Sequence, residues 1–267
     1  MNLRRALAVA AVVLLVVVAA VVGGLYLYAE YLYRDSYGSD YAYRVHVAPS
    51  ATVTNVTLLV PLPVRDGEPV VDAATVSHPF TPDGWAYDVV ETEYGPMLRI
   101  RADEIPTDPT YHYSVVRNNR LVGWKTIPAS EYDPNNASHV RATHEEVDVS
   151  ATVESDRTLD TRAPIESEAL LRPQANRTSA ACRFSPDEEG ACYAYSGWTF
   201  LSYDAATETG VYVSVELRGA NSWWVFGWNG NEYVDDQSVE VVGPQDGWVA
   251  TEGRLETGRG NYRNPPR

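Results

Sequence analysis

The sequence predicts an all-β protein, an antiparallel β-sandwich ectodomain preceded by one N-terminal transmembrane helix. Three observations support this fold class. An uncharged run of 22 residues extends from Ala6 to Leu27. After it, apolar and polar residues alternate with a period of two, which is typical of half-buried strands. Turn-forming residues then recur at intervals of about 8–12, a pattern typical of sandwiches and barrels.

The N-terminal run predicts a membrane anchor. A spanning helix needs about 20 apolar residues, whereas a cleaved signal peptide has an apolar core of about 7–15. We therefore expect residues 1–5 to form a cytoplasmic stub, 6–28 an uncleaved signal anchor and 29–40 a juxtamembrane stalk. Arg4 and Arg5 precede the run, so the positive-inside rule places the N-terminus in the cytoplasm and the rest of the chain outside the cell.

Strand candidates fill the rest of the chain. Hairpins are predicted around turns at 93–96, 117–120 and 229–231, and another joins 211–218 to 222–228 through 219–221. We expect residues 41–257 to form one large sandwich. The alternative is two smaller domains, divided near the loop at 128–138. The acid-free tail, 258–267, is expected to be mobile.

Two further signals are typical of exported chains. Cys182 and Cys192 flank a turn-forming segment and are predicted to form a disulfide, which persists outside the cytoplasm. Two free thiols or half of a metal site are the alternatives. Asn55, Asn136 and Asn176 each begin an Asn-x-Ser/Thr triplet and are candidate glycosylation sites.

The net charge of the chain restricts the classes of partner that it can bind. The chain has 36 acidic and 21 basic residues, net −15, and Lys125 is the only lysine. Such an acidic surface argues against nucleic acid as a partner. Acid-rich, lysine-poor composition resembles that of proteins from salt-loving archaea, where molar salt shortens the Debye length to about 3 Å and screens carboxylate repulsion. An acidic surface in a GC-rich mesophile is the alternative.

No pattern of catalytic residues is present. The sequence lacks a nucleophile elbow, a glycine-rich phosphate loop and a dinucleotide fingerprint, so no catalytic residue and no cofactor is predicted. His139 and His144 fall on opposite faces of a strand, which weakens a zinc site. The acidic segments 187–189 and 235–236 contain oxygen ligands that suit Ca²⁺, but they follow no calcium-loop pattern. They are interpreted as hydrated surface, and no metal is predicted.

The aromatic segment 223–228 remains as a binding candidate. Alternation places Trp224, Phe226 and Trp228 on one face, which we expect to be core. Trp223 falls on the opposite face and is the one candidate binding surface.

Taken together, the sequence predicts a single-pass cell-membrane protein with a non-catalytic binding or envelope role. The membrane is its first partner, through residues 6–28, and an envelope glycan or protein is the second. An anchored extracytoplasmic hydrolase with carboxylate acid/base residues and an accessory subunit of a membrane complex are the alternatives.

Overall fold

The computed structural model describes residues 3–76, 85–107, 110–117, 120–142, 147–183 and 190–263. It begins with one helix, α1 (Leu3–Ser36). The strands of the first half are β1 (Gly38–Pro49), β2 (Val53–Arg65), β3 (Glu68–Pro69), β4 (Ala86–Thr92), β5 (Gly95–Ile105), β6 (Thr110–Arg117), β7 (Arg120–Ile127) and β8 (His139–Ala142). Those of the second half are β9 (Val147–Glu154), β10 (Leu170–Arg172), β11 (Ala175–Ser179), β12 (Cys192–Asp204), β13 (Gly210–Trp224), β14 (Trp228–Val242) and β15 (Gln245–Gly260).

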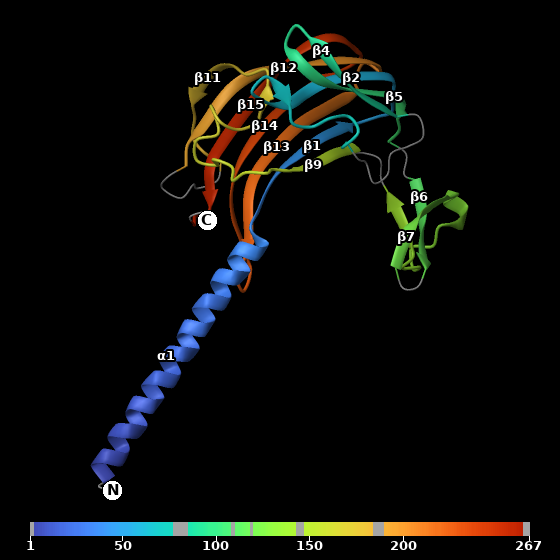
Figure 1. Ribbon diagram of the computed structural model, residues 1–267. Coiled ribbons are helices and arrows are strands. Elements are labelled where there is room, and N and C mark those ends of the chain that lie inside the picture. Colours follow the sequence, from blue (N-terminus) through green and yellow to red (C-terminus); the bar gives the residue numbers. More distant parts are fainter. Residues whose placement is uncertain are drawn as a thin grey trace.

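The helix is long and apolar enough to cross a membrane, and it is the only such helix among the described residues. Its side chains from Ala11 to Leu27 are all exposed. The helix continues to Ser36, and β1 begins at Gly38 (Figure 1). The stalk expected at 29–40 therefore does not exist as a separate element. Residues 29–36 extend the helix because nothing in that stretch, which contains neither proline nor glycine, interrupts it.

The main body is one large antiparallel sheet that curls around a core (Figure 1), so the all-β prediction is confirmed. Nine strands follow the order β4-β5-β2-β12-β15-β14-β13-β1-β9, and three short strands pair off this path. Although β1 and β2 are five places apart in this order, the Tyr43 hydroxyl of β1 donates to the Pro61 carbonyl of β2 at 2.8 Å. The two halves of a single curled sheet thus face each other across the core.

Alternation explains how each strand contributes to that core. In β13, Val211, Val213, Val215 and Leu217 are buried, as the sequence pattern predicts. The register places Val45 of β1 between Val215 of β13 and Val149 of β9, so apolar residues lie in rows across neighbouring strands. Such rows contribute about 25 cal/mol for each Å² of apolar surface that they remove from water.

A second, three-stranded sheet is separate from the first. Its order is β7-β6-β8, and none of its strands pairs with the curled sheet among the described residues. It is inserted between β5 and β9, which both belong to the main sheet. Division into two similar domains near 128–138 is therefore wrong: strands from both halves of the chain form one sheet, and the loop lies within the insertion. Long-range pairings such as β2 with β12 decide this, and local patterns do not reveal them.

The predicted hairpins have mixed outcomes. Turns at 93–96 and 117–120 lie between β4 and β5 and between β6 and β7, so these two hairpins are confirmed. The turn at 229–231 is wrong, as is the reversal at 219–221, because β13 is continuous from Gly210 to Trp224 and the chain reverses at 225–227. The tail was expected to be mobile. As far as Arg263 it is instead held in place, because Arg263 contacts the helix. Residues 264–267 lie outside the described residues.

Candidate functional site

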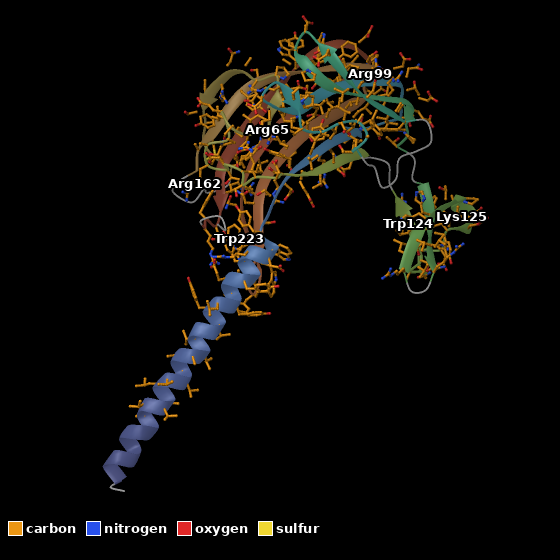
Figure 2. All side chains as sticks on the ribbon, viewed as in Figure 1. Arg65, Arg99, Trp124, Lys125, Arg162 and Trp223 are labelled. Atoms are coloured by element: carbon orange, nitrogen blue, oxygen red, sulfur yellow. A yellow bond between two sulfur atoms is a disulfide. The ribbon has the colours of Figure 1, made fainter. Side chains whose placement is uncertain are left out.

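The end of α1 packs directly against the β domain, at a contact that we call the junction: Glu30, Tyr33, Ser36, Tyr37, Trp223 and Arg263. Trp223, near the end of β13, is only 4% exposed. Its ring meets that of Tyr33 edge-on at 5.6 Å and stacks on that of Tyr37 at 6.0 Å. Such aromatic pairs add about 0.5–1.5 kcal/mol each beyond the area they bury. Figure 2 shows Trp223 where the helix meets the sheet.

Polar contacts complete the junction. The Trp224 backbone N–H donates to the Ser36 hydroxyl oxygen at 2.8 Å, and that hydroxyl donates to the Leu32 carbonyl at 2.6 Å. The Arg263 guanidinium donates to Glu30 at 2.6 Å and lies 4.0 Å from the centre of the Tyr33 ring. Three segments far apart in the sequence therefore meet at one point, and the domain is fixed to its helix.

The aromatic segment is arranged in the reverse of the prediction. Trp223, expected on the outer surface, is buried in the junction, whereas Phe226 and Trp228, expected in the core, are 63% and 73% exposed. The error follows from the hairpin position, because moving the reversal to 225–227 takes Phe226 and Trp228 out of the first strand. The end of the helix, which sequence alternation does not include, then covers Trp223. As a surface for an external ligand, Trp223 is not available.

The other predicted site residues are a cysteine pair and three asparagines. Cys182 and Cys192 form a disulfide, with Cα atoms 5.3 Å apart. Asn55, Asn136 and Asn176 are all exposed. The Asn55 amide nitrogen donates to Asp204 at 2.6 Å. Glycosylation itself stays a prediction.

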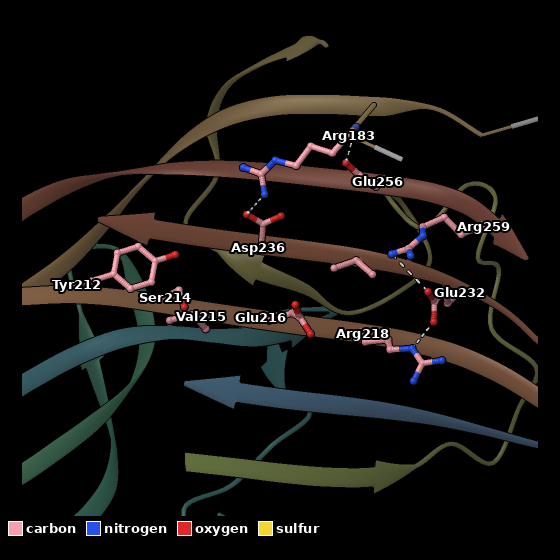
Figure 3. A pocket seen from close by; sticks show the side chains of 11 residues that line it. Arg183, Tyr212, Ser214, Val215, Glu216, Arg218, Glu232, Asp236, Glu256 and Arg259 are labelled. Carbon is pink, nitrogen blue, oxygen red and sulfur yellow. Dashed lines mark hydrogen bonds and ion pairs between the residues drawn. The ribbon is translucent and has the colours of Figure 1, made fainter. Parts of the chain in front are cut away.

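A groove of about 490 Å³ crosses the outer face of β13, β14 and β15 (Figure 3). Three of the four acids that line it contact arginines. Arg183 lies 3.6 Å from Asp236, and the backbone N–H of Arg183 donates to Glu256 at 3.0 Å. Glu232 accepts from Arg218 and also lies 3.3 Å from Arg259. Burial raises the pKa of Asp236, and the nearby arginines oppose this shift. The arrangement is a lattice of ion pairs across three strands.

The metal-ligand candidates from the sequence do not form a metal site among the described residues. Among the described residues no group of three or more His, Cys, Asp or Glu side chains could hold a metal ion. A His139 ring nitrogen accepts from the Asp133 backbone N–H at 3.0 Å. His144 and the acidic segment 187–189 lie outside the described residues.

Asp235 is the residue that sequence reasoning missed. Predicted as hydrated surface, it is 0% exposed on the inner face of β14. It accepts hydrogen bonds from the Tyr195 hydroxyl at 2.5 Å, the Leu171 N–H at 2.8 Å and the Gln174 amide at 2.9 Å. Burial raises the pKa of Asp235 to about 7. Its role is to fix β10 and the following loop against the inside of the sheet. Asp235 follows Tyr233 by two residues, so alternation places both side chains on the same face of β14. This is the sequence signal that would have identified Asp235 as an inward-facing residue.

The three-stranded sheet differs from the rest of the surface. None of its described residues is buried. Between residues 110 and 142 it has four basic and two acidic side chains, net +2, in a chain of net charge −15. Lys125 and Trp124 lie on β7 (Figure 2). The large apolar side chains that it exposes are Tyr113, Val116, Leu121, Val122 and Trp124.

No known family model matches this sequence, and no curated protein or solved structure is significantly similar to it. The function is therefore argued from the site alone.

Proposed function

We propose that this protein is a non-catalytic binding protein of the cell envelope, anchored in the cell membrane by residues 6–28. Arg4 and Arg5 favour a cytoplasmic N-terminus. The Cys182–Cys192 disulfide favours an oxidising compartment for the β domain. The exposed Asn55, Asn136 and Asn176 fit glycosylation outside the cell.

The observation that carries a binding role is the exposed surface of the three-stranded sheet, β6, β7 and β8. Apolar side chains such as Leu121, 55% exposed, are covered by no inner layer among the residues that the structure describes. Exposed apolar groups gathered on one small unit are typical of an interaction surface. Its net positive charge suits an acidic protein of the same envelope, since the rest of this chain is itself strongly acidic.

The salt-loving character predicted from composition belongs to the same proposal. At molar salt, charges beyond about 3 Å are screened, so only ion pairs in direct contact would add to affinity. The apolar side chains of the small sheet would then supply most of the binding free energy, because burial of apolar surface does not depend on Coulomb attraction. Basic residues beside them keep the sheet's own charge from repelling an acidic partner.

The hydrolase alternative has weaker support. Acid/base hydrolysis needs two carboxyl groups that converge on a substrate, one of them protonated. In the groove of Figure 3, Glu232 and Asp236 lie in ion pairs with arginines, which hold the two side chains in place. These contacts support a structural role for the groove.

Co-purification from native membranes in molar KCl tests the proposal, with two matched variants. Leu121→Asp places a charge on the small sheet, at a residue that is 55% exposed, and Val242→Asp places the same charge on the curled sheet, at a residue that is 63% exposed. We expect an acidic partner, identified by mass spectrometry, to accompany wild type and Val242→Asp but not Leu121→Asp. Equal recovery with both variants, or loss with both, would show that the small sheet is not the binding surface.

A further inference from the structure

The reversal between β13 and β14, residues 224–228, projects beside the helix. We call it the hairpin tip. In the hairpin tip, the ring of Phe226 lies 6.3 Å from the ring of Tyr28. The base of the hairpin tip is held by the hydrogen bond from the Trp224 N–H to the Ser36 hydroxyl. Tyr28 precedes Ser36 by eight residues, which is about 12 Å along a helix. The hairpin tip therefore reaches back along the helix toward its apolar run, as Figure 1 shows.

That position is the edge of the hydrocarbon layer if the helix spans the membrane. The first charged residues after Arg5 are Glu30 and Arg34, which follow Leu27 within two helical turns. Tyr28 thus lies where apolar core gives way to head groups, the level at which tyrosine and tryptophan are enriched in membrane proteins. Phe226, in contact range of Tyr28, lies at the same level.

The composition of the hairpin tip fits that environment. Its five residues carry no charge and include three aromatic rings, on a protein of net charge −15. Phe226 and Trp228 are 63% and 73% exposed. In water, these two exposed rings would be unfavourable, whereas the membrane interface stabilises large amphipathic rings.

The backbone supplies an independent observation. Phe226 has a φ of 54°, in the left-handed region, although Gly227 follows it. A bulky residue at positive φ costs about 1–2 kcal/mol and is a true outlier. A turn selected for stability alone would place glycine there. The reversal is nonetheless closed, because the Val225 N–H donates to the Gly227 carbonyl at 3.0 Å, which leaves fewer backbone groups to be desolvated.

We propose that the hairpin tip is a second membrane contact, which places Phe226 and Trp228 in the lipid interface beside the anchor helix. This proposal rests on the membrane anchoring proposed above. With a helix and a hairpin both engaged, the β domain is held in one orientation on the bilayer. The partner is the lipid of the membrane that the helix crosses, because the hairpin tip and the helix meet at the same depth.

Fluorophore accessibility tests the proposal in the full chain. Two variants are made, Phe226→Cys as the test and Val242→Cys as the control. The new cysteine in each is labelled with an environment-sensitive dye. Both positions are 63% exposed, they lie near opposite ends of β14, and no described cysteine is free to react. The protein is reconstituted in vesicles of equimolar phosphatidylcholine and phosphatidylglycerol. Quenching is measured with doxyl groups placed near the lipid head group and with iodide on both sides of the membrane.

We expect the dye at 226 to be quenched by the lipid-borne groups and several-fold less by iodide than the dye at 242. Iodide quenching equal at the two positions would overturn the proposal, as would a dye at 226 shielded from both quenchers, which indicates a covering protein. Flotation of the vesicles separates the two proposals. Protein that fails to float contradicts the anchor and the hairpin tip together, whereas floating protein with an iodide-accessible 226 contradicts the hairpin tip alone.

Discussion

The curled sheet and the three-stranded sheet are built from the same kind of strand, but their apolar side chains differ in burial. Leu58 in β2 is 0% exposed, whereas Leu121 in β7 is 55% exposed. Both lie in antiparallel strands. The difference is a second layer: the curled sheet supplies its own by bending until β1 meets β2, and three strands are too few to do so. Strand pairing is a local property, but burial depends on the whole sheet.

Charge separates the same two regions. Residues 110–142 carry net +2, so the remainder of the chain, which totals −15, carries −17. Self-repulsion should therefore act on the curled sheet and spare the small one. The predictions below test this contrast, from the largest expected effect to the smallest.

Removing salt should unfold the curled sheet. At about 0.01 M salt the Debye length reaches about 30 Å, so the excess carboxylates repel one another across much of the domain. Circular dichroism of the protein in detergent, at falling KCl, should show the strand signal lost before millimolar concentrations. A midpoint of thermal unfolding that does not change with KCl would contradict the salt-loving assignment.

Trp223 and Trp228 should respond oppositely to truncation. Trp223→Ala removes a buried ring that packs against both Tyr33 and Tyr37 and should cost about 3–5 kcal/mol. Trp228→Ala, on the exposed hairpin tip, should change stability by about 0.5 kcal/mol or less in detergent. Urea unfolding of both variants measures this. Equal losses of stability in the two variants would contradict a chain reversal at residues 225–227.

The two leucines test the layer argument directly. Leu58→Ala should destabilise the protein by about 2–5 kcal/mol, because it leaves a cavity in a closed core. Leu121→Ala should stay within about 0.5 kcal/mol, since water already reaches that side chain. Both are measured by thermal unfolding in the same KCl concentration. If Leu121→Ala costs as much as Leu58→Ala, the small sheet is buried against something in solution.

Asp235 should give the closed sheet a pH dependence. Its pKa is raised to about 7, against about 3.9 for an exposed aspartate. Its stabilising contribution is therefore fully present below about pH 4 and is lost as the pH rises through about 7. Protonated, it can donate to Gln174, whose buried amide oxygen has no partner among the described residues.

The Asn variant isolates this effect from the other carboxyl groups. Asp235→Asn resembles the protonated acid, so wild type should lose about 4 kcal/mol relative to it between pH 4 and 8. Urea unfolding across that range gives the difference curve. A difference that stays constant with pH would show that Asp235 does not titrate in the folded protein.

The sequence by itself determined the local features. The uncharged run gave a helix, alternation gave the buried faces of β2 and β13, and glycine-containing reversals gave the β4–β5 hairpin. Cys182 and Cys192, ten residues apart, were close enough in sequence for their pairing to be predicted. Each of these depends on contacts among neighbours in the chain, which period and composition report directly.

The tertiary structure alone decided the rest. Which Trp is buried depended on a helix end 188 residues away from Trp224, and the burial of Asp235 depended on Leu171 and Tyr195 from other strands. Alternation along a strand assigns each residue to one of two faces, but it does not show which face another element will cover. The single curled sheet likewise arose from the pairings of β1 with β13 and of β2 with β12, because hydrogen bonds between distant strands leave no periodic trace in either one.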